Sequence, residues 1–237
     1  MPLFILETGS IGQRVLLDLA REHKARILFA STSEVYGDAE VHPQPESYFG
    51  NVNTIGHRSC YDESKRYGEA LSVAHSREFG TEIRIARIFN TYGSRMRPDD
   101  GRIIPNFFMQ ALQKQSLSVY GEGSQTRSFC FVADQVAGQF ALMQSSEKTP
   151  VNIGNPIERT VLEIADAINK LTGNKAPLRY LPLPENDPKQ RRPDIRKAKE
   201  KIGWEPKVSL ETGLNECLTY FAKELAASPG GIEVPTL

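Results

Sequence analysis

The sequence predicts an α/β protein built on a mostly parallel sheet with helices on both faces. Short apolar runs alternate along the chain with longer segments whose apolar residues recur at helical spacing, and this alternation is typical of βαβ units. The chain has 237 residues, of which 39% are hydrophobic and 24% are charged. This length and composition suit one α/β domain, or one domain with a smaller second lobe.

Seven segments have the pattern of helices. Gly80 follows the second of them and suits the left-handed residue that ends many helices. Pro105 lies in the first turn of the third helix, where proline is tolerated. Thr160 and Glu163 have the spacing of a capping box at the start of the fifth helix. The predicted helices span residues 11–21, 61–78, 104–113, 134–143, 160–171, 194–202 and 210–225.

Five shorter segments predict strands. Residues 26–31 (RILFAS) form an apolar run after a turn, which indicates a buried parallel strand. The sequence EIRIARIF alternates between apolar and polar residues and predicts a second strand. The predicted strands span residues 26–31, 82–89, 117–120, 128–132 and 179–183, with polar loops at 37–55 and 95–101 and a flexible tail at 228–237.

The composition excludes several classes of protein. The 29 Lys and Arg residues balance 29 Asp and Glu residues, which argues against a protein that binds nucleic acid or an anionic membrane. No apolar run approaches the roughly 20 residues of a membrane span. The cysteines, Cys60, Cys130 and Cys217, have no CxxC spacing, and we expect them to stay reduced in the cytoplasm. The four histidines are scattered, so we predict no metal site.

A glycine pair near the start resembles part of a dinucleotide-binding loop. Gly9 and Gly12 follow a short apolar run and precede a predicted helix, as glycines do where a backbone approaches a pyrophosphate. The third glycine of that pattern is missing, because Val15 stands at its position. We therefore interpret the segment as the beginning of an ordinary covering helix.

Tyr61 and Lys65 form a candidate catalytic pair. Residues four apart on a helix lie on one face, one turn from each other. An ammonium group beside a tyrosine stabilises the phenolate, so that the tyrosine can take a proton from an alcohol. The pattern Y-x-x-x-K is common, and an exposed tyrosine with a solvated lysine is the alternative reading.

Polar side chains follow two predicted strands. The sequence STSEVYG (31–37) comes directly after the first strand and contains Glu34 among small hydroxyl residues. Asn90 occupies the corresponding place after the second strand. Ligands of open α/β sheets bind beyond the carboxyl ends of the strands, so these residues are binding or acid–base candidates. A turn stabilised by side-chain hydrogen bonds is the alternative for both segments.

Two basic segments could recognise phosphate or carboxylate groups. The turn at 121–127 offers Gln125 and Arg127, and Arg191 and Arg192 precede a proline. Arginine suits bidentate recognition of such anions. Taken alone, each segment could equally be solvated surface.

In combination, these motifs resemble the extended short-chain dehydrogenase/reductase family. The resemblance runs from about Ser10 to Leu225 and is nearest to the UDP-glucuronate decarboxylase branch. Ser33 precedes Glu34 where dTDP-glucose 4,6-dehydratases usually have an Asp-Glu pair. The motifs that carry the resemblance are STSEVYG, RSCYDESK, RIFNTYG, YGEGSQTRSF, RRPDI and WEPKVSLETGL.

The resemblance implies an NAD-dependent decarboxylation of UDP-glucuronate to UDP-xylose through a 4-keto intermediate. Tyr61 would take the proton of the sugar 4-hydroxyl, and Thr32 would bond the same hydroxyl. Lys65 would hold the nicotinamide ribose, and Glu34 would assist the loss of the carboxylate or the reprotonation. Tyr61, Lys65 and Arg102 match cofactor positions. The implied substrate-binding residues are Ser33, Asn90, Asn106, Tyr120, Gln125, Arg127 and Arg191.

The beginning of the chain departs from the family. The family opens on a strand, a GxxGxxG loop and a helix, and only 25 residues precede the RILFAS strand here. A βαβ unit needs roughly 30 residues or more. We therefore expect a partial Rossmann-type fold without its N-terminal half: a truncated NAD-binding domain at 1–150, a smaller substrate lobe at 151–227 with contributions from 92–125, and a tail at 228–237.

Three functions stay open at this point. The chain is a decarboxylase, a 4-epimerase or 4,6-dehydratase on the same scaffold, or a non-catalytic remnant that binds a nucleotide sugar or a partner protein. The helices bearing Ile11 and Tyr61 usually form a dimer bundle in the family, so the resemblance also implies a homodimer.

Overall fold

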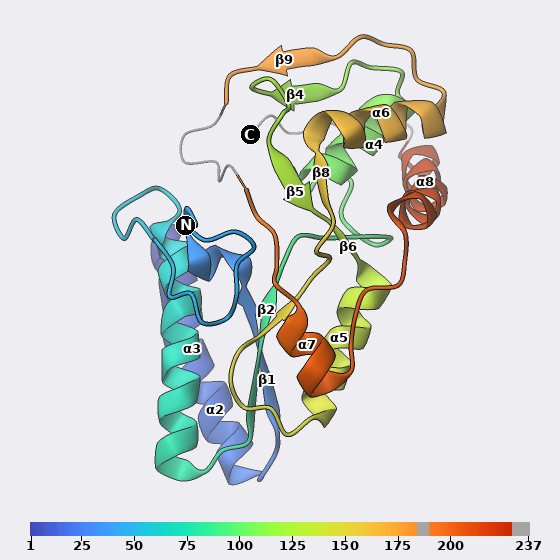
Figure 1. Ribbon diagram of the computed structural model, residues 1–237. Coiled ribbons are helices and arrows are strands. Elements are labelled where there is room, and N and C mark those ends of the chain that lie inside the picture. The colour runs from blue at the N-terminus through green and yellow to red at the C-terminus, as the bar shows by residue number, and fades with distance from the viewer. Residues whose placement is uncertain (184–189, 229–237) are drawn as a thin grey trace.

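A computed structural model describes residues 1–183 and 190–228 of the chain. The elements divide between a lower region built on a parallel sheet and an upper lobe of helices and short strand pairs (Figure 1). The predicted α/β class is confirmed.

The lower sheet has three parallel strands in the order β1-β2-β7. The strands β1 (Ile27–Thr32) and β2 (Ile83–Ile88) pair along their whole length, so that Ala30 lies opposite Ala86. The third strand, β7 (Val151–Ile153), was not among the predicted strands. Its three residues are all buried.

The two faces of this sheet carry different helices. In β1 and β2, odd-numbered side chains such as Phe29 and Ile85 pack against α2 (Gln13–Glu22) and α3 (Ser59–Phe79). Even-numbered side chains of these two strands, such as Ala86, belong to the cluster formed with α5 (Val132–Gln144) and α7 (Arg196–Ile202). Successive side chains of a strand point to opposite faces, which explains why the strands are apolar almost throughout.

The N-terminal segment is helical from residue 2 to residue 22. It consists of α1 (Pro2–Glu7), a π-helical turn η1 (Thr8–Gly12) and α2. A Cβ atom added at Gly9 would lie 2.6 Å from Cβ of Ser64 on α3. Gly9 therefore permits close packing of two helices. The dinucleotide-loop alternative is wrong, and the covering helix begins earlier than expected.

The upper lobe has its own apolar core. Phe108, Ile164 and Phe221 are fully buried there and come from three different helices. The strand pairs β4–β9 and β5–β8 complete the lobe. Its elements are α4 (Ile103–Leu112), β4 (Ser118–Tyr120), β5 (Thr126–Ser128), β8 (Glu158–Thr160), α6 (Val161–Thr172), β9 (Arg179–Leu181) and α8 (Leu210–Ala226).

Several predicted details need correction. The predicted strand at 128–132 does not form as one element: β5 ends at Ser128, and β6 (Cys130–Phe131) pairs instead with β3 (Thr91–Tyr92). The helix predicted from residue 194 begins at Arg196, because the Asp194 side chain accepts the backbone N–H of that residue at 3.0 Å. The capping box of Thr160 and Glu163 is present.

The proposed division at residue 150 does not follow the packing of the elements. The strand β7 pairs with β2, and α7 packs against β7 and α5. Both elements come after residue 150, yet they lie in the lower region. The assignment of residues 1–150 to a cofactor-binding domain and of residues 151–227 to a substrate lobe stays a proposal. Residues 229–237 of the predicted tail lie outside the described part of the chain.

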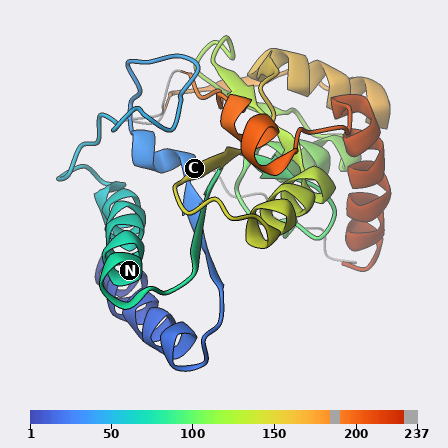
Figure 2. The ribbon, with the colours of Figure 1, turned by 60° about the horizontal axis from the view of Figure 1, so that its bottom comes forward.

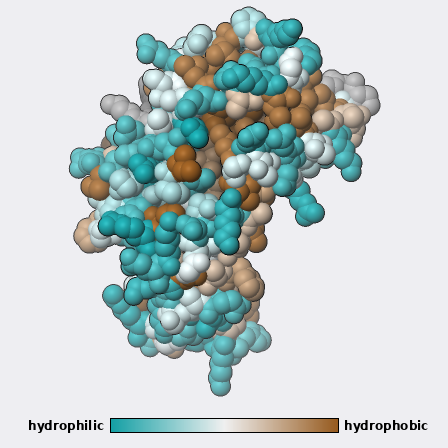
Figure 3. Space-filling model, turned by 45° about the vertical axis from the view of Figure 1, so that its right-hand side comes forward, coloured by the Kyte–Doolittle hydropathy of each residue, from teal (hydrophilic) through white to brown (hydrophobic). Residues whose placement is uncertain are grey.

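Apolar side chains are exposed in both regions. Ile11, Val15 and Leu16 on the N-terminal helical segment are 65%, 59% and 52% exposed. Figure 2 shows α2 and α3 side by side at the edge of the molecule. Figure 3 shows apolar surface across the upper part of another face.

Candidate functional site

The candidate site begins where β1 ends. Thr32 is the last residue of the strand, and its Oγ1 accepts the backbone N–H of Glu34 at 3.2 Å. This bond starts a short 3₁₀ helix, η2 (Ser33–Tyr36). The hydroxyl groups and the carboxylate thus lie beyond the carboxyl end of a parallel strand, as the sequence predicted.

The helix α3 brings Tyr61 and Lys65 to the same end of the sheet. The Tyr61 side chain is 37% exposed. Lys65 Nζ lies 5.7 Å from the centre of the Tyr61 ring and donates a hydrogen bond to the Ala30 carbonyl at 3.0 Å. Burial lowers the pKa of Lys65. The pair therefore lies on one helix face as predicted, with the ammonium held by the backbone of β1.

Two arginines converge on the Glu34 carboxylate. Arg191 binds it as a fork, with Nη2 donating to Oε2 at 3.0 Å and Nη1 donating to Oε1. Arg58 Nη2 lies 3.1 Å from Oε2. Burial alone would raise the pKa of Glu34, but the two guanidinium groups outweigh it and lower that pKa. Glu34 is thus held as a carboxylate.

Asp62 is a second carboxyl group in this place. Its side chain is 8% exposed, and its buried Oδ1 has no hydrogen-bond partner among the described residues. Burial and the charge of Glu34 raise the pKa of Asp62 to about 6, against the opposing effect of Arg58 and Arg191. Two carboxyl groups that share a site are expected to differ in this way.

A buried network lies below the site. Arg87 on β2 forms a fork with Glu69 on α3, at 2.9 Å for Nε to Oε1 and 2.7 Å for Nη2 to Oε2. Ser31 Oγ donates to the same carboxylate at 2.6 Å, and Arg87 Nη1 donates to the Tyr36 hydroxyl at 3.0 Å. Glu69 lies one helical turn after Lys65. The network therefore joins α3 to β1, β2 and η2 next to the candidate catalytic residues.

The structure brings some predicted residues together and separates others. Thr32, Ser33, Glu34 and Arg191 form one cluster beside the first turns of α3. Asn90 follows β2, and its carbonyl accepts the Cys130 N–H at 2.9 Å. Arg102 lies before α4, where its Nε is 3.1 Å from Oδ1 of Asp100 and its side chain is 70% exposed.

The remaining predicted residues belong to the upper lobe. Asn106 is on α4, and its Nδ2 donates to the Gly101 carbonyl at 2.9 Å. Gln125 Nε2 donates to the Tyr120 carbonyl at 2.8 Å. Arg127 is buried on β5 and donates Nη1 to the Thr126 carbonyl at 2.8 Å. These residues stay predictions as substrate contacts.

Arg58 and Asp62 were not among the predicted site residues. Both lie within three residues of Tyr61, in the RSCYDESK motif that carries part of the family resemblance. Residues 58 and 62 are four apart at the start of the helix, so this spacing could have indicated that both side chains lie on the face that bears Tyr61 or next to it. Their convergence on Glu34 depends on a turn more than 20 residues away, so it was not visible in the local sequence.

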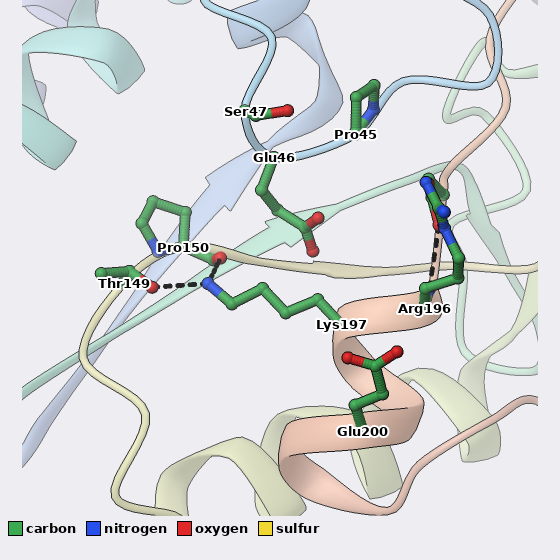
Figure 4. Close-up of a pocket in the computed structure, with 9 residues that line it drawn as sticks. Pro45, Glu46, Ser47, Thr149, Pro150, Arg196, Lys197 and Glu200 are labelled. Carbon is green, nitrogen blue, oxygen red and sulfur yellow. Dashed lines mark hydrogen bonds and ion pairs between the residues drawn. The ribbon is translucent and has the colours of Figure 1, made fainter.

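A hollow of about 480 Å³ lies apart from these residues (Figure 4). Lys197 donates from one wall to Thr149 Oγ1 and to the Pro150 carbonyl. Glu46 Oε1 accepts the Asn152 N–H at 2.8 Å. Lys197 is thus bonded to the opposite wall, and the lining contains none of the predicted site residues. It consists of Pro45, Glu46, Ser47, Thr149, Pro150, Asp194, Arg196, Lys197 and Glu200.

Within residues 1–183 and 190–228, no three His, Cys, Asp or Glu side chains gather as metal ligands would. In the same part of the chain, no helix has both the length and the apolar character needed to cross a membrane.

One family model matches most of the chain. The family model described as GDP-mannose 4,6 dehydratase matches residues 1–217. The chain belongs to this family, which is part of the extended short-chain dehydrogenase/reductases.

Curated relatives point to one branch of the family. The chain is 52% identical over 234 residues to UDP-glucuronic acid decarboxylase 1 of Danio rerio, covering 99% of the chain and 56% of the relative. It is 53% identical over 213 residues to UDP-glucuronic acid decarboxylase 3 of Arabidopsis thaliana, covering 90% of the chain and 62% of the relative. The chain thus spans about three fifths of these relatives.

Solved structures share the fold. The UDP-glucose 4-epimerase of Thermotoga maritima has a TM-score of 0.89 and 30% identity, covering 95% of this chain and 72% of the epimerase. A Bacillus cereus UDP-glucuronic acid 4-epimerase, solved with a fluorinated UDP-glucuronic acid and NAD, has a TM-score of 0.83 and 28% identity. The match covers 92% of this chain and 68% of that epimerase.

Proposed function

We propose that this chain provides the catalytic and sugar-binding part of an NAD-dependent UDP-glucuronate decarboxylase, which forms UDP-xylose through a 4-keto intermediate. The observation that carries the proposal is the convergence of Thr32, Glu34 and Arg191 beside the helix turns that bear Tyr61 and Lys65. Identity of 52–53% to UDP-glucuronic acid decarboxylases supports the choice of reaction.

The proposed roles follow from the chemistry of the side chains. The Tyr61 side chain, as the phenolate, takes up the proton of the sugar 4-hydroxyl, and Thr32 forms a hydrogen bond with that hydroxyl. The resulting ketone lies β to the carboxylate, so the electrons of the breaking C–C bond flow into an enolate. Glu34, with Arg191, assists this loss of carbon dioxide or the reprotonation of the carbon.

The residues near β1 suit a hydroxyl-rich cofactor such as NAD. Lys65 Nζ has three donor hydrogens, of which one is directed to the Ala30 carbonyl, and Tyr61 is partly exposed beside it. Tyr61, Lys65 and Arg102 would hold the cofactor. Bound NAD would supply the hydride-transfer chemistry that oxidises C4 of the sugar and later reduces it again.

The upper lobe would hold the rest of the substrate. Asn106, Tyr120, Gln125 and Arg127 are the proposed contacts to the nucleotide, with Ser33, Asn90 and Arg191 nearer the sugar. The fork of a buried arginine suits a diphosphate.

A direct assay tests the proposal. The purified chain is incubated with NAD and UDP-glucuronate, and carbon dioxide and UDP-xylose are measured. Glu34→Ala is expected to reduce carbon dioxide release by about 100-fold or more while UDP binding stays. Equal loss of activity and of UDP binding would contradict the role of Glu34.

A 4-epimerase is the second candidate, favoured by the structural similarity to two 4-epimerases. An epimerase would return a UDP-sugar that keeps its carboxylate and has the opposite configuration at C4. Product analysis by NMR separates the two. Binding of UDP without NAD binding or turnover would instead support a non-catalytic protein that binds a nucleotide sugar.

We also propose a homodimer in the cytoplasm. The exposed apolar residues of α1, η1 and α2, together with Tyr67 on α3, which is 50% exposed, support a helix-bundle interface. Measurement of the molar mass by light scattering tests it, and a monomer at high concentration would contradict it.

A further inference from the structure

Arg58 occupies a distinctive place in the Glu34 cluster. It directly precedes α3, and its side chain is 52% exposed. Arg191 is different, because its side chain is 8% exposed and grips both oxygens of Glu34. Arg58 Nη2 contacts Oε2 from the solvent side of the cluster. One arginine of the cluster is thus buried in a two-pronged ion pair, while the other is half exposed to solvent.

The cluster attracts a further anion. Two guanidinium groups share the single carboxylate of Glu34, and the backbone N–H groups that begin the 21-residue helix α3 add positive potential beside Arg58. An incoming carboxylate can replace Glu34 on Arg58 while Glu34 keeps the fork of Arg191. No charge is then left without a partner, which removes the main cost of such an exchange.

Asp62 makes room for the added negative charge. It lies in the first turn of α3, one turn after Arg58. The charged groups that act on it are Glu34, Arg58, Arg191 and its neighbour Glu63. Its buried Oδ1 has no hydrogen-bond partner among the described residues. A carboxyl group in this setting takes up a proton when another anion approaches. The cluster therefore accepts a second carboxylate without accumulating charge.

We infer that Arg58 is a specificity-determining residue that binds the carboxylate on the sugar ring and distinguishes a UDP-uronate from a neutral UDP-hexose. The inference rests on the proposed function, because that function places C4 of the sugar at Tyr61, three residues from Arg58. The carboxylate is on the next ring carbon, close to the helix start.

Binding measurements on the full chain test this inference. Isothermal titration calorimetry is carried out with UDP-glucuronate and UDP-glucose, which differ only at C6. The unchanged chain is expected to prefer UDP-glucuronate. Arg58→Met is expected to weaken the binding of UDP-glucuronate by about 10- to 100-fold, because a charge-assisted hydrogen bond is lost. The binding of UDP-glucose is expected to weaken by less than about twofold. Arg58→Lys is expected to restore part of the preference.

Arg97→Met is the matched control. Arg97 is 78% exposed and pairs with Asp99, two residues away on a surface loop. This variant makes the same change from Arg to Met at an exposed position. It is expected to keep the affinities for UDP-glucuronate and for UDP-glucose. Circular dichroism of each variant shows whether the fold is intact.

Two results would overturn the inference. One is a loss of affinity in Arg58→Met that is equal for both ligands, and the other is the absence of any preference in the unchanged chain. Carbon dioxide release tests the proposed function separately. A chain that prefers UDP-glucuronate through Arg58 but releases no carbon dioxide would retain the inference and refute the decarboxylase.

Discussion

Two arginine–carboxylate clusters lie within a few residues of each other along α3, and they are built for different tasks. The closed cluster consists of Glu69, Arg87, Ser31 and Tyr36, and the open cluster consists of Glu34, Arg191, Arg58 and Asp62. In the closed cluster, the Arg87 and Glu69 side chains are each 12% exposed. In the open cluster, Arg58 is half exposed and one carboxyl oxygen of Asp62 has no described partner.

The same kind of ion pair, an arginine with a carboxylate, thus occurs in an enclosed and in a partly exposed setting. Arg87 also donates to the Tyr36 hydroxyl, which in turn donates to Asn152 Oδ1 at 2.7 Å on β7. These bonds join α3 to β1, β2 and β7, so the network holds α3 against the sheet. The open cluster lies about two turns nearer the start of α3, at Asp62, and the Arg58 side chain there is half exposed. Rigid support and an exposed arginine thus lie near each other along one helix.

Breaking the closed cluster is expected to have the largest effect. Glu69→Ala leaves Arg87 buried without its carboxylate, so the free energy of unfolding should fall by about 3–5 kcal/mol. Urea denaturation followed by circular dichroism measures this change. A loss below about 1 kcal/mol would show that solvent already reaches the cluster.

Moving α3 away from β1 is expected to have the next largest effect. A Cβ atom at Gly68 would lie 2.3 Å from Cζ of Phe29, so Gly68→Ala should cost about 1–3 kcal/mol of stability. Combining it with Phe29→Leu should recover part of this loss, and a double-mutant cycle measures the coupling. Strictly additive effects would mean that the two residues do not compete for space.

Asp62→Asn is expected to stabilise the protein, in contrast to Glu69→Ala. The pKa of Asp62 is raised to about 6 from 3.8, so its contribution to stability is complete below about pH 3.8 and is lost as the pH rises through about 6. Removing the charge should therefore add about 1–2 kcal/mol at pH 7.5 and little at pH 4. Urea denaturation at both pH values tests this. A variant that is less stable at pH 7.5 would show that the Asp62 carboxylate has a favourable partner.

Arg97→Met is expected to have the smallest effect. Arg97 and Asp99 form an exposed pair on a loop, and such pairs contribute little because solvent and salt screen them. The midpoint of urea denaturation should stay where it is in the unchanged chain. A clear shift would mean that exposure alone does not separate the two clusters from ordinary surface pairs.

Local patterns predicted much of the fold. Helical spacing identified α3, α4, α6 and α8 to within a residue or two, since helix periodicity and capping are local properties. The strand β7 was missed because three buried residues carry no periodicity. Its place beside β2 is a long-range contact that no neighbouring residue signals.

The glycine pair near the start shows the limit of motif reading. Gly9 suggested a phosphate-binding loop, yet its lack of a Cβ atom leaves the space that Ser64 of α3 occupies. Both uses need a close approach to the backbone. Only the packing of two helices distinguishes one use from the other.

The site shows the same division. Periodicity and motif spacing predicted the α/β class, most helices and the candidate groups of Glu34, Tyr61 and Lys65, and the family resemblance added Thr32, because all of these features are local to the chain. Tertiary structure alone decided that Arg191, 157 residues from Glu34, grips that carboxylate, and that Arg58 and Asp62 join it. Such contacts depend on how helices and strands pack, and the energy that selects them comes from burial and charge pairing between distant segments.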